Sequence, residues 1–127
     1  MQTESNSFDM AFVANISNDE VSALEAIHFD GRIVVVEMNG LRVSFSGDLP
    51  TLIVQNRDQP GHVRDVSDIL ARDGVNIATL HLYRDYPGGN AVMIIETDKA
   101  VHQESLDALR AIRGITGVTF VSTEKEV

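Results

Sequence analysis

Side chains that commonly carry catalysis form no recognisable centre in this 127-residue sequence. It has no cysteine, which excludes disulfides, thiolate zinc sites and cysteine nucleophiles from this polypeptide. The four histidines show no metal-ligand spacing, so we expect no metal site; His62, near a helix start, is expected at the surface or beside a ligand. Ser44, Ser46 and Ser67 have no His–Asp arrangement nearby that would suggest a triad. We therefore expect no catalytic residue and a chain that is non-catalytic by itself.

The charge, the apolar pattern and the length of the chain disfavour several further classes of protein. The net charge of −9 opposes binding to nucleic acid or to anionic membranes. No apolar run approaches the roughly 20 residues that span a bilayer, and residues 1–9 lack the features of a secretory signal. The length suits one compact domain with a short additional piece. We expect a soluble cytoplasmic protein.

The first part of the chain predicts a β-hairpin extension. Residues 1–20 are polar and are expected to be a flexible or truncated segment. Residues 21–29 fit either a helix or a strand, and we favour the strand. The β-branched run 32–37 and the alternating run 41–45 are separated by Asn39-Gly40, the strongest short-range hairpin signal. The hairpin extension and its linker therefore occupy residues 21–50.

A strand and a helix are expected next. Residues 51–56 form a short, mostly apolar strand. Pro60 suits the first position of a helix, and Asp58 lies where a capping side chain accepts backbone donors. Val63, Val66 and other apolar residues recur at helical spacing. Gly74 is expected to end this helix in the left-handed conformation.

The remaining elements complete a βαββαβ order. They are a strand over 75–83, a turn over 86–90, a strand over 91–97, a helix over 103–112 ended by Gly114, and a strand over 118–122. Two βα units joined by a hairpin give a four-stranded sheet with both helices on one face. The sequence therefore predicts an α+β, ferredoxin-like domain over residues 51–123, with a tail over 124–127.

Three short motifs in this domain resemble the ACT domain. They are Asn56-Arg57-Asp58-Gln59-Pro60-Gly61, Gly74-Val75-Asn76-Ile77-Ala78 and Gly88-Gly89-Asn90-Ala91-Val92-Met93. Each is weak alone, but together they have the order and separation of that family's Asp-x-Pro-Gly, Gly-[Val/Ile]-Asn-Ile and Gly-Gly features. The resemblance implies a module that senses amino acids and regulates or assembles an enzyme.

The upstream segment resembles the region that leads into the ACT domain of the iron–sulfur L-serine dehydratase β chain. The similar residues are 31–41 and 46–52. The resemblance implies that L-serine deamination to pyruvate and the iron–sulfur cluster belong to another chain or domain, such as a catalytic α chain, with no cofactor in this one. Phosphoglycerate dehydrogenase has a related ACT region, so an ACT module of an enzyme of that kind is the alternative function. A ligand-free, stand-alone dimerisation protein is another.

The ACT resemblance also implies the ligand-binding residues. By motif position these are Asn56, Asp58 and Asn76, with the backbone of Gly61 close by. Asp58 would pair with the ammonium group of a small amino acid such as L-serine, and the amides would donate to its carboxylate or accept from its amine. Structural explanations stay open, because Asp58 also suits a helix cap and Asn76 a tight turn. Since ACT domains associate through sheet edges, we expect a homodimer.

Overall fold

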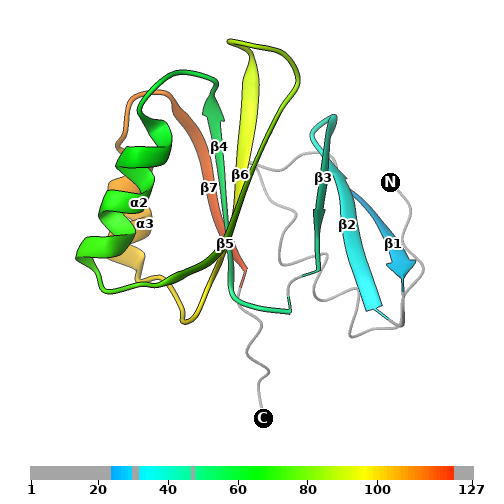
Figure 1. Ribbon diagram of the computed structural model, residues 1–127, viewed down its shortest axis with the longest axis horizontal. Helices are drawn as coiled ribbons and strands as arrows, with labels where there is room; N and C mark the ends of the chain where they lie inside the picture. Colours follow the sequence, from blue (N-terminus) through cyan, green and yellow to red (C-terminus); the bar gives the residue numbers. More distant parts are fainter. Residues whose placement is uncertain (1–23, 30–31, 47, 122–127) are drawn as a thin grey trace.

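The computed structural model describes residues 24–29, 32–46 and 48–121, which form three stacked layers (Figure 1). Two helices make one layer, a four-stranded sheet the middle layer, and a three-stranded sheet the third. The expected N-terminal segment (1–20) and tail (124–127) lie outside the described residues.

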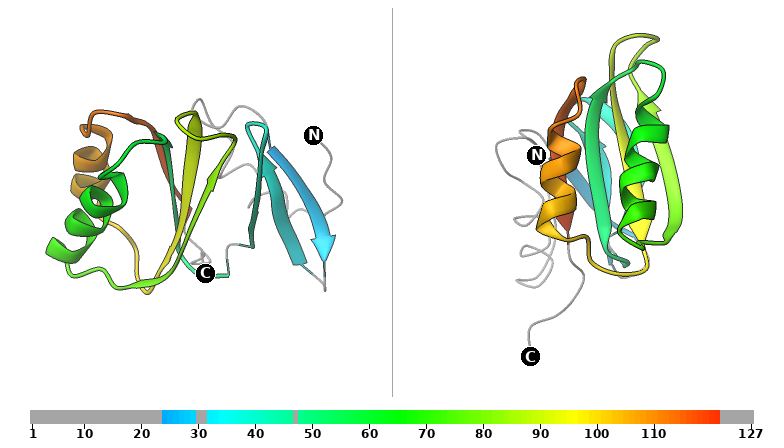
Figure 2. Two further views of the ribbon diagram at one scale, coloured as in Figure 1. Left: turned by 45° about the horizontal axis from the view of Figure 1, so that its top comes forward. Right: turned by 90° about the vertical axis from the view of Figure 1, so that its left-hand side faces the viewer.

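The middle and helical layers have the predicted βαββαβ order. The elements are β4 (Thr51–Arg57), α2 (His62–Arg72), β5 (Ile77–Arg84), β6 (Asn90–Thr97), α3 (Gln103–Arg110) and β7 (Ile115–Val121). The sheet order is β5-β6-β4-β7, and all neighbouring strands are antiparallel. Both helices cover the same face of this sheet (Figure 2). The ferredoxin-like α+β prediction is confirmed.

The upstream extension is a three-stranded sheet. Its strands are β1 (Leu24–Phe29), β2 (Arg32–Met38) and β3 (Leu41–Phe45), paired in that order. Asn39 and Gly40 have φ angles of 50° and 85°, as the predicted turn between β2 and β3 requires. Of the two alternatives for residues 21–29, the strand is confirmed over the described part. The favoured strand and the predicted hairpin thus form one sheet.

Strand β6 illustrates how the middle sheet is buried on both faces. Met93 and Ile95 belong to the core that packs under the helices, whereas Val92 and Ile94 belong to the core shared with the three-stranded sheet. Successive side chains of a strand point to opposite faces, so a strand covered on both sides becomes almost continuously apolar. The three-stranded sheet is therefore part of the packed unit.

Helix α2 packs on the sheet through one stripe and ends as predicted. His62, Val66 and Leu70 recur every fourth residue and are its buried side chains. Gly74 follows with a φ of 71°, and the Val75 N–H donates to the Leu70 carbonyl at 2.9 Å. This left-handed ending satisfies a terminal carbonyl of the helix.

The start of α2 corrects two predictions. The helix begins at His62 and not at Pro60, because Gly61 precedes it with a φ of 96° that lies outside the helical region. No side chain caps this end of the helix, so Asp58 is not its cap. The left-handed turn at Gly61 separates Asp58 from the helical N–H groups.

The other boundary differences are smaller. Strand β7 begins at Ile115 instead of Val118, because Gly117 pairs with Gln55 of β4 although glycine is rare in strands. Helix α3 ends at Arg110 rather than at residue 112.

The two-sided core predicts very different costs for two isoleucine substitutions. Ile53 on β4 is 0% exposed in the core between the sheets, whereas Ile27 on β1 is 44% exposed. Ile53→Ala should lower the free energy of unfolding by about 2–5 kcal/mol, and Ile27→Ala by about 0.5 kcal/mol or less. Urea denaturation of both variants measures this. Equal costs would contradict packing of the two sheets against each other.

Candidate functional site

The loop after β4 is tied to the β5–β6 hairpin through Asp58. Its carboxylate Oδ2 accepts hydrogen bonds from Arg84 Nη1 at 2.8 Å and from the Gly88 N–H at 3.0 Å. The Asp58 N–H donates to the Gly89 carbonyl at 2.9 Å. These contacts hold the predicted Asp-x-Pro-Gly loop against the predicted Gly-Gly hairpin.

These contacts also set the titration of Asp58. The Gly88 N–H and then the Arg84 guanidinium hold the pKa of this carboxyl below its usual value, because both stabilise the ionised form. A lowered folded-state pKa means that the contact stabilises the fold above the unfolded-state pKa of about 3.9. This stabilisation is lost as the pH falls through the folded-state value. The carboxylate is therefore ionised at neutral pH.

Asn56 lies buried beside this loop on the helix-facing side of the sheet. Leu52 and Val54 pack under the helices, so Asn56, two residues further along β4, faces the same layer. It is 3% exposed, and its Nδ2 donates to the Arg57 carbonyl at 2.7 Å. Its Oδ1 finds no hydrogen-bond partner among the described residues. A buried acceptor without a partner costs free energy. The space between the sheet and the start of α2 therefore contains a polar group that lacks a donor within the described ranges.

His62 adds a second buried polar group at the same end of α2. It is 6% exposed, so the expected surface position is wrong: the first residue of the buried α2 stripe faces the sheet. Its Nε2 lies 3.4 Å from Gln59 Oε1, and its Nδ1 has no partner in the described part of the chain. The ring packs so closely on Gly114 that a Cβ there would lie 2.6 Å from Nε2.

Gly61 leaves the loop open. Nothing lies within 4 Å of the position that a Cβ would occupy, so its glycine is required by the φ of 96° and not by packing. Its carbonyl accepts from the Asp65 N–H at 3.0 Å and begins the helix. The backbone around Gly61 is therefore accessible to a small molecule.

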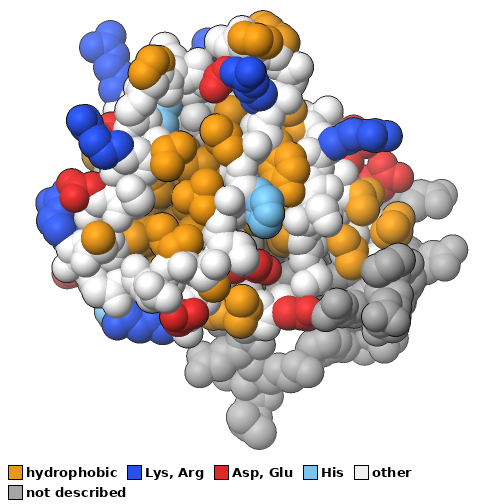
Figure 3. Space-filling view, viewed as in Figure 1, with side chains coloured by type: hydrophobic (Ala, Val, Ile, Leu, Met, Phe, Trp, Pro, Cys, Tyr) orange, Lys and Arg blue, Asp and Glu red, His pale blue; other side chains and the backbone are white. Residues whose placement is uncertain are grey.

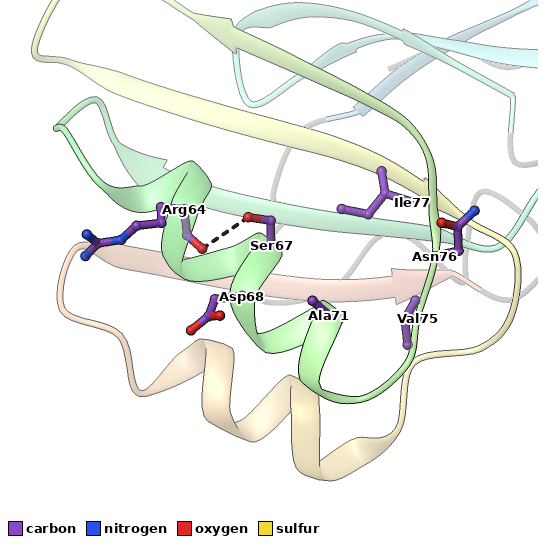
Figure 4. Close-up of a pocket in the computed structure, with 7 residues that line it drawn as sticks. All are labelled: Arg64, Ser67, Asp68, Ala71, Val75, Asn76 and Ile77. Carbon is purple, nitrogen blue, oxygen red and sulfur yellow. Dashed lines mark hydrogen bonds between the residues drawn. The ribbon is translucent and has the colours of Figure 1, made fainter.

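Asn76 lies at the opposite end of α2. Its Nδ2 donates to Asp98 Oδ2 at 2.8 Å, and it lines a groove of about 450 Å³ between α2 and the start of β5 (Figure 4). The 11 residues of α2 put about 16 Å of helix between Gly61 and this end. Of the four predicted residues, one copy of the chain thus brings together Asn56, Asp58 and Gly61 but not Asn76.

Arg84 is the residue that sequence reasoning missed. It follows 26 positions after Asp58, and no local pattern connects the two. Only the pairing of β5 with β6, and of β6 with β4, brings the end of β5 beside the loop after β4. The lone sequence signal was its position at the end of a strand, directly before the turn.

The described residues contain no group of three or more His, Asp or Glu side chains that could hold a metal ion. Nor is either described helix long and apolar enough to cross a membrane.

Comparison with known proteins identifies residues 50–114 as an ACT domain. Over 79 residues the chain is 32% identical to the probable L-serine dehydratase, beta chain, of Bacillus subtilis, covering 62% of this chain and 36% of that protein. It is 32% identical over 77 residues to D-3-phosphoglycerate dehydrogenase of Methanocaldococcus jannaschii, covering 61% of this chain and 15% of that protein.

A further relative shares more of the chain. D-3-phosphoglycerate dehydrogenase of Bacillus subtilis is 26% identical over 113 residues, which cover 86% of this chain and 21% of that protein. The chain therefore spans a minor part of each of these three relatives.

The contact between His62 and Gly114 predicts unequal costs for two glycine substitutions. Gly114 and Gly74 have φ angles of 96° and 71°, but only at Gly114 would a Cβ meet other atoms. Each alanine should cost about 1–2 kcal/mol for the left-handed conformation, and Gly114→Ala should cost more because it displaces His62. Urea denaturation compares the two. In a His62→Ala background, Gly114→Ala should cost about as much as Gly74→Ala, because the clash with the ring is gone. Equal costs for the two single glycine variants would refute the contact.

Proposed function

The chain belongs to the ACT domain family, and from this membership we propose that it is a regulatory module that binds a small amino acid between two copies of itself. The observation that carries the proposal is the separation of the predicted ligand residues. Asn56 and Asp58 lie at one end of α2 and Asn76 at the other. A second copy is the simplest way to complete the site.

Strand β5 supplies an edge on which two copies can pair. It is an outer strand of the sheet, and its residues are exposed or half-exposed along its whole length. Leu82 on this strand is 45% exposed, and hydrophobic side chains gather on the face that carries β5 (Figure 3). A long, open strand with apolar side chains is a template for pairing.

The other outer strand is a poorer candidate. In β7, residues 117–119 are buried, and the Val118 carbonyl accepts a hydrogen bond from Arg110 Nη2 at 2.8 Å. An arginine that binds a strand carbonyl competes with a second strand for that group. This difference supports pairing through β5.

Antiparallel pairing of two β5 strands would complete two equivalent sites. The strand is about 26 Å long, with Asn76 just before its first residue and Arg84 at its end. A two-fold axis through its middle would bring Asn76 of a second copy to the Arg84 end of the first, where Asp58 lies. Each site would then combine Asp58 and Asn56 of one copy with Asn76 of the other.

The available atoms suit an amino acid. Asp58 is ionised and uses one carboxylate oxygen for both of its hydrogen bonds, so Oδ1 can accept from an ammonium group. Asn76 uses its Nδ2 on Asp98, which leaves its Oδ1 to accept from the same ammonium in the proposed site. Gly61 leaves room for the ligand against the backbone.

We propose L-serine as the ligand and a dehydratase α chain as the partner that carries the chemistry. The relative named as an L-serine dehydratase beta chain supports this. The sequence has no cysteine to bind an iron–sulfur cluster, so the cluster would belong to that partner. The phosphoglycerate dehydrogenase relatives support a second candidate, a regulatory module of an enzyme of that kind, since one of them matches 86% of the chain. In either case this module would regulate and not catalyse.

Dimerisation through β5 predicts that a charge on this strand separates the copies. The wild type should be a dimer, and Leu82→Lys should be a monomer over the same concentration range. A lysine buried between the two copies would lose its hydration. Ile27→Lys, at a side chain equally exposed on β1, should stay dimeric. Light scattering coupled to gel filtration measures both. A monomeric wild type, or a dimeric Leu82→Lys, would reject this interface.

A site made from two copies predicts complementation between inactive variants. Asp58→Ala and Asn76→Ala should each abolish L-serine binding in calorimetry, whereas Glu104→Ala on α3 should bind normally. Mixing the two inactive variants should restore binding, because each heterodimer keeps one complete site. A ligand at about 100 times its dissociation constant should also stabilise the fold by about 2.7 kcal/mol. A folded, dimeric wild type that binds none of the common amino acids would leave the ligand-free assembly module as the better account.

A further inference from the structure

Arg84 presents a positioned, exposed guanidinium at the proposed site. It is the last residue of β5, and its side chain is 53% exposed while that of Asp58 is 19% exposed. Its hydrogen bond to Asp58 uses Nη1 alone, at 2.8 Å. A guanidinium has five N–H donors, so most of its donor capacity faces outward from this contact. Gly88 fixes the same carboxylate oxygen from the hairpin and so holds the pair in place.

We propose that Arg84 binds the α-carboxylate of the amino-acid ligand, so that Asp58 and Arg84 together recognise a zwitterion. This inference rests on the proposed function and assigns a residue to it that the ACT motifs do not contain. The ammonium group would lie against Asp58 and the carboxylate against the guanidinium, which matches each ligand charge with its opposite. Arginine is suited to this task because its planar fork binds a carboxylate through two parallel hydrogen bonds.

The predicted amides are poor alternatives for the carboxylate. Asn56 is 3% exposed, and its Nδ2 already donates to the Arg57 carbonyl. Asn76 donates through Nδ2 to Asp98 at 2.8 Å. The Asn56 amide is therefore enclosed in the protein, and Asn76 has one of its two N–H groups already bonded. A charged donor is also the stronger partner for a carboxylate.

The Asp58–Arg84 pair leaves the arginine with donors for a further partner. Exposed ion pairs typically contribute little to stability, and this one uses only Nη1 of the guanidinium. In the antiparallel pairing described above, Arg84 would lie next to the start of β5 in a second copy. The ligand carboxylate would therefore bind at the seam, where it can bridge the two copies.

Arg64 provides a matched control. It is an exposed arginine near the start of α2 that lines the same groove as Asn76 and pairs with Asp65 at 3.3 Å. If the groove alone held the ligand, Arg64 would be the carboxylate-binding arginine. Substituting each arginine separates the two positions.

The test is calorimetry of L-serine and of L-serinamide, which lacks the carboxylate charge, with wild type, Arg84→Gln, Arg84→Lys and Arg64→Gln. Arg84→Gln should weaken L-serine binding at least tenfold and leave the weaker binding of L-serinamide unchanged. Arg84→Lys should be intermediate, and Arg64→Gln should match wild type. Thermal unfolding and light scattering verify that each variant is folded and dimeric.

The outcomes separate this inference from the proposed function. Unchanged L-serine affinity in Arg84→Gln, with loss in Asn76→Ala, would overturn the role of Arg84 and leave the amino-acid site standing. An equal loss for L-serine and L-serinamide would assign Arg84 a structural role and would also overturn the inference. A wild type that binds no amino acid would overturn both.

Discussion

Burial of strand β4 on every side is the constraint on which the rest of the structure depends. It is hydrogen-bonded to β6 on one edge and to β7 on the other. Leu52 and Val54 pack under the helices, and Ile53 packs against the three-stranded sheet. A strand that is enclosed in this way has one register, because a shift by one residue would exchange its two faces. The loop that follows it therefore leaves the sheet at a fixed place.

The loop after β4 is linked to several other parts of the molecule. Asp58 joins it to Arg84 and to Gly88, so the end of β5 and the β5–β6 hairpin move with the loop. His62 joins the start of α2 to Gly114 before β7. A molecule bound at Asp58 would therefore act on the end of the outer strand through which we propose that copies pair. By thermodynamic linkage, a ligand shared between two copies favours pairing as much as pairing favours the ligand.

The proposed division of the site between two copies would suit a small regulatory module. A single copy supplies a carboxylate, a buried amide and an open glycine at one end, and a second amide about 16 Å of helix away. In this proposal the module would serve different enzymes, because binding would depend on its own sheet edge and not on a catalytic centre. Its relatives are parts of proteins named as a serine dehydratase chain and as phosphoglycerate dehydrogenases. Fold alone does not choose between them, since function lies in the site.

The features that the sequence determined by itself are those governed by neighbouring residues. The turn at Asn39-Gly40 and the helix end at Gly74 depend on local backbone preferences, and the order of strand and helix patterns predicted the ferredoxin-like domain. Tertiary structure alone decided that Asp58 binds Arg84 instead of capping α2, and that His62 is buried. The physical reason is that a side chain's partner depends on strand register and layer packing. These join residues 26 positions apart and leave no trace in the residues around either one.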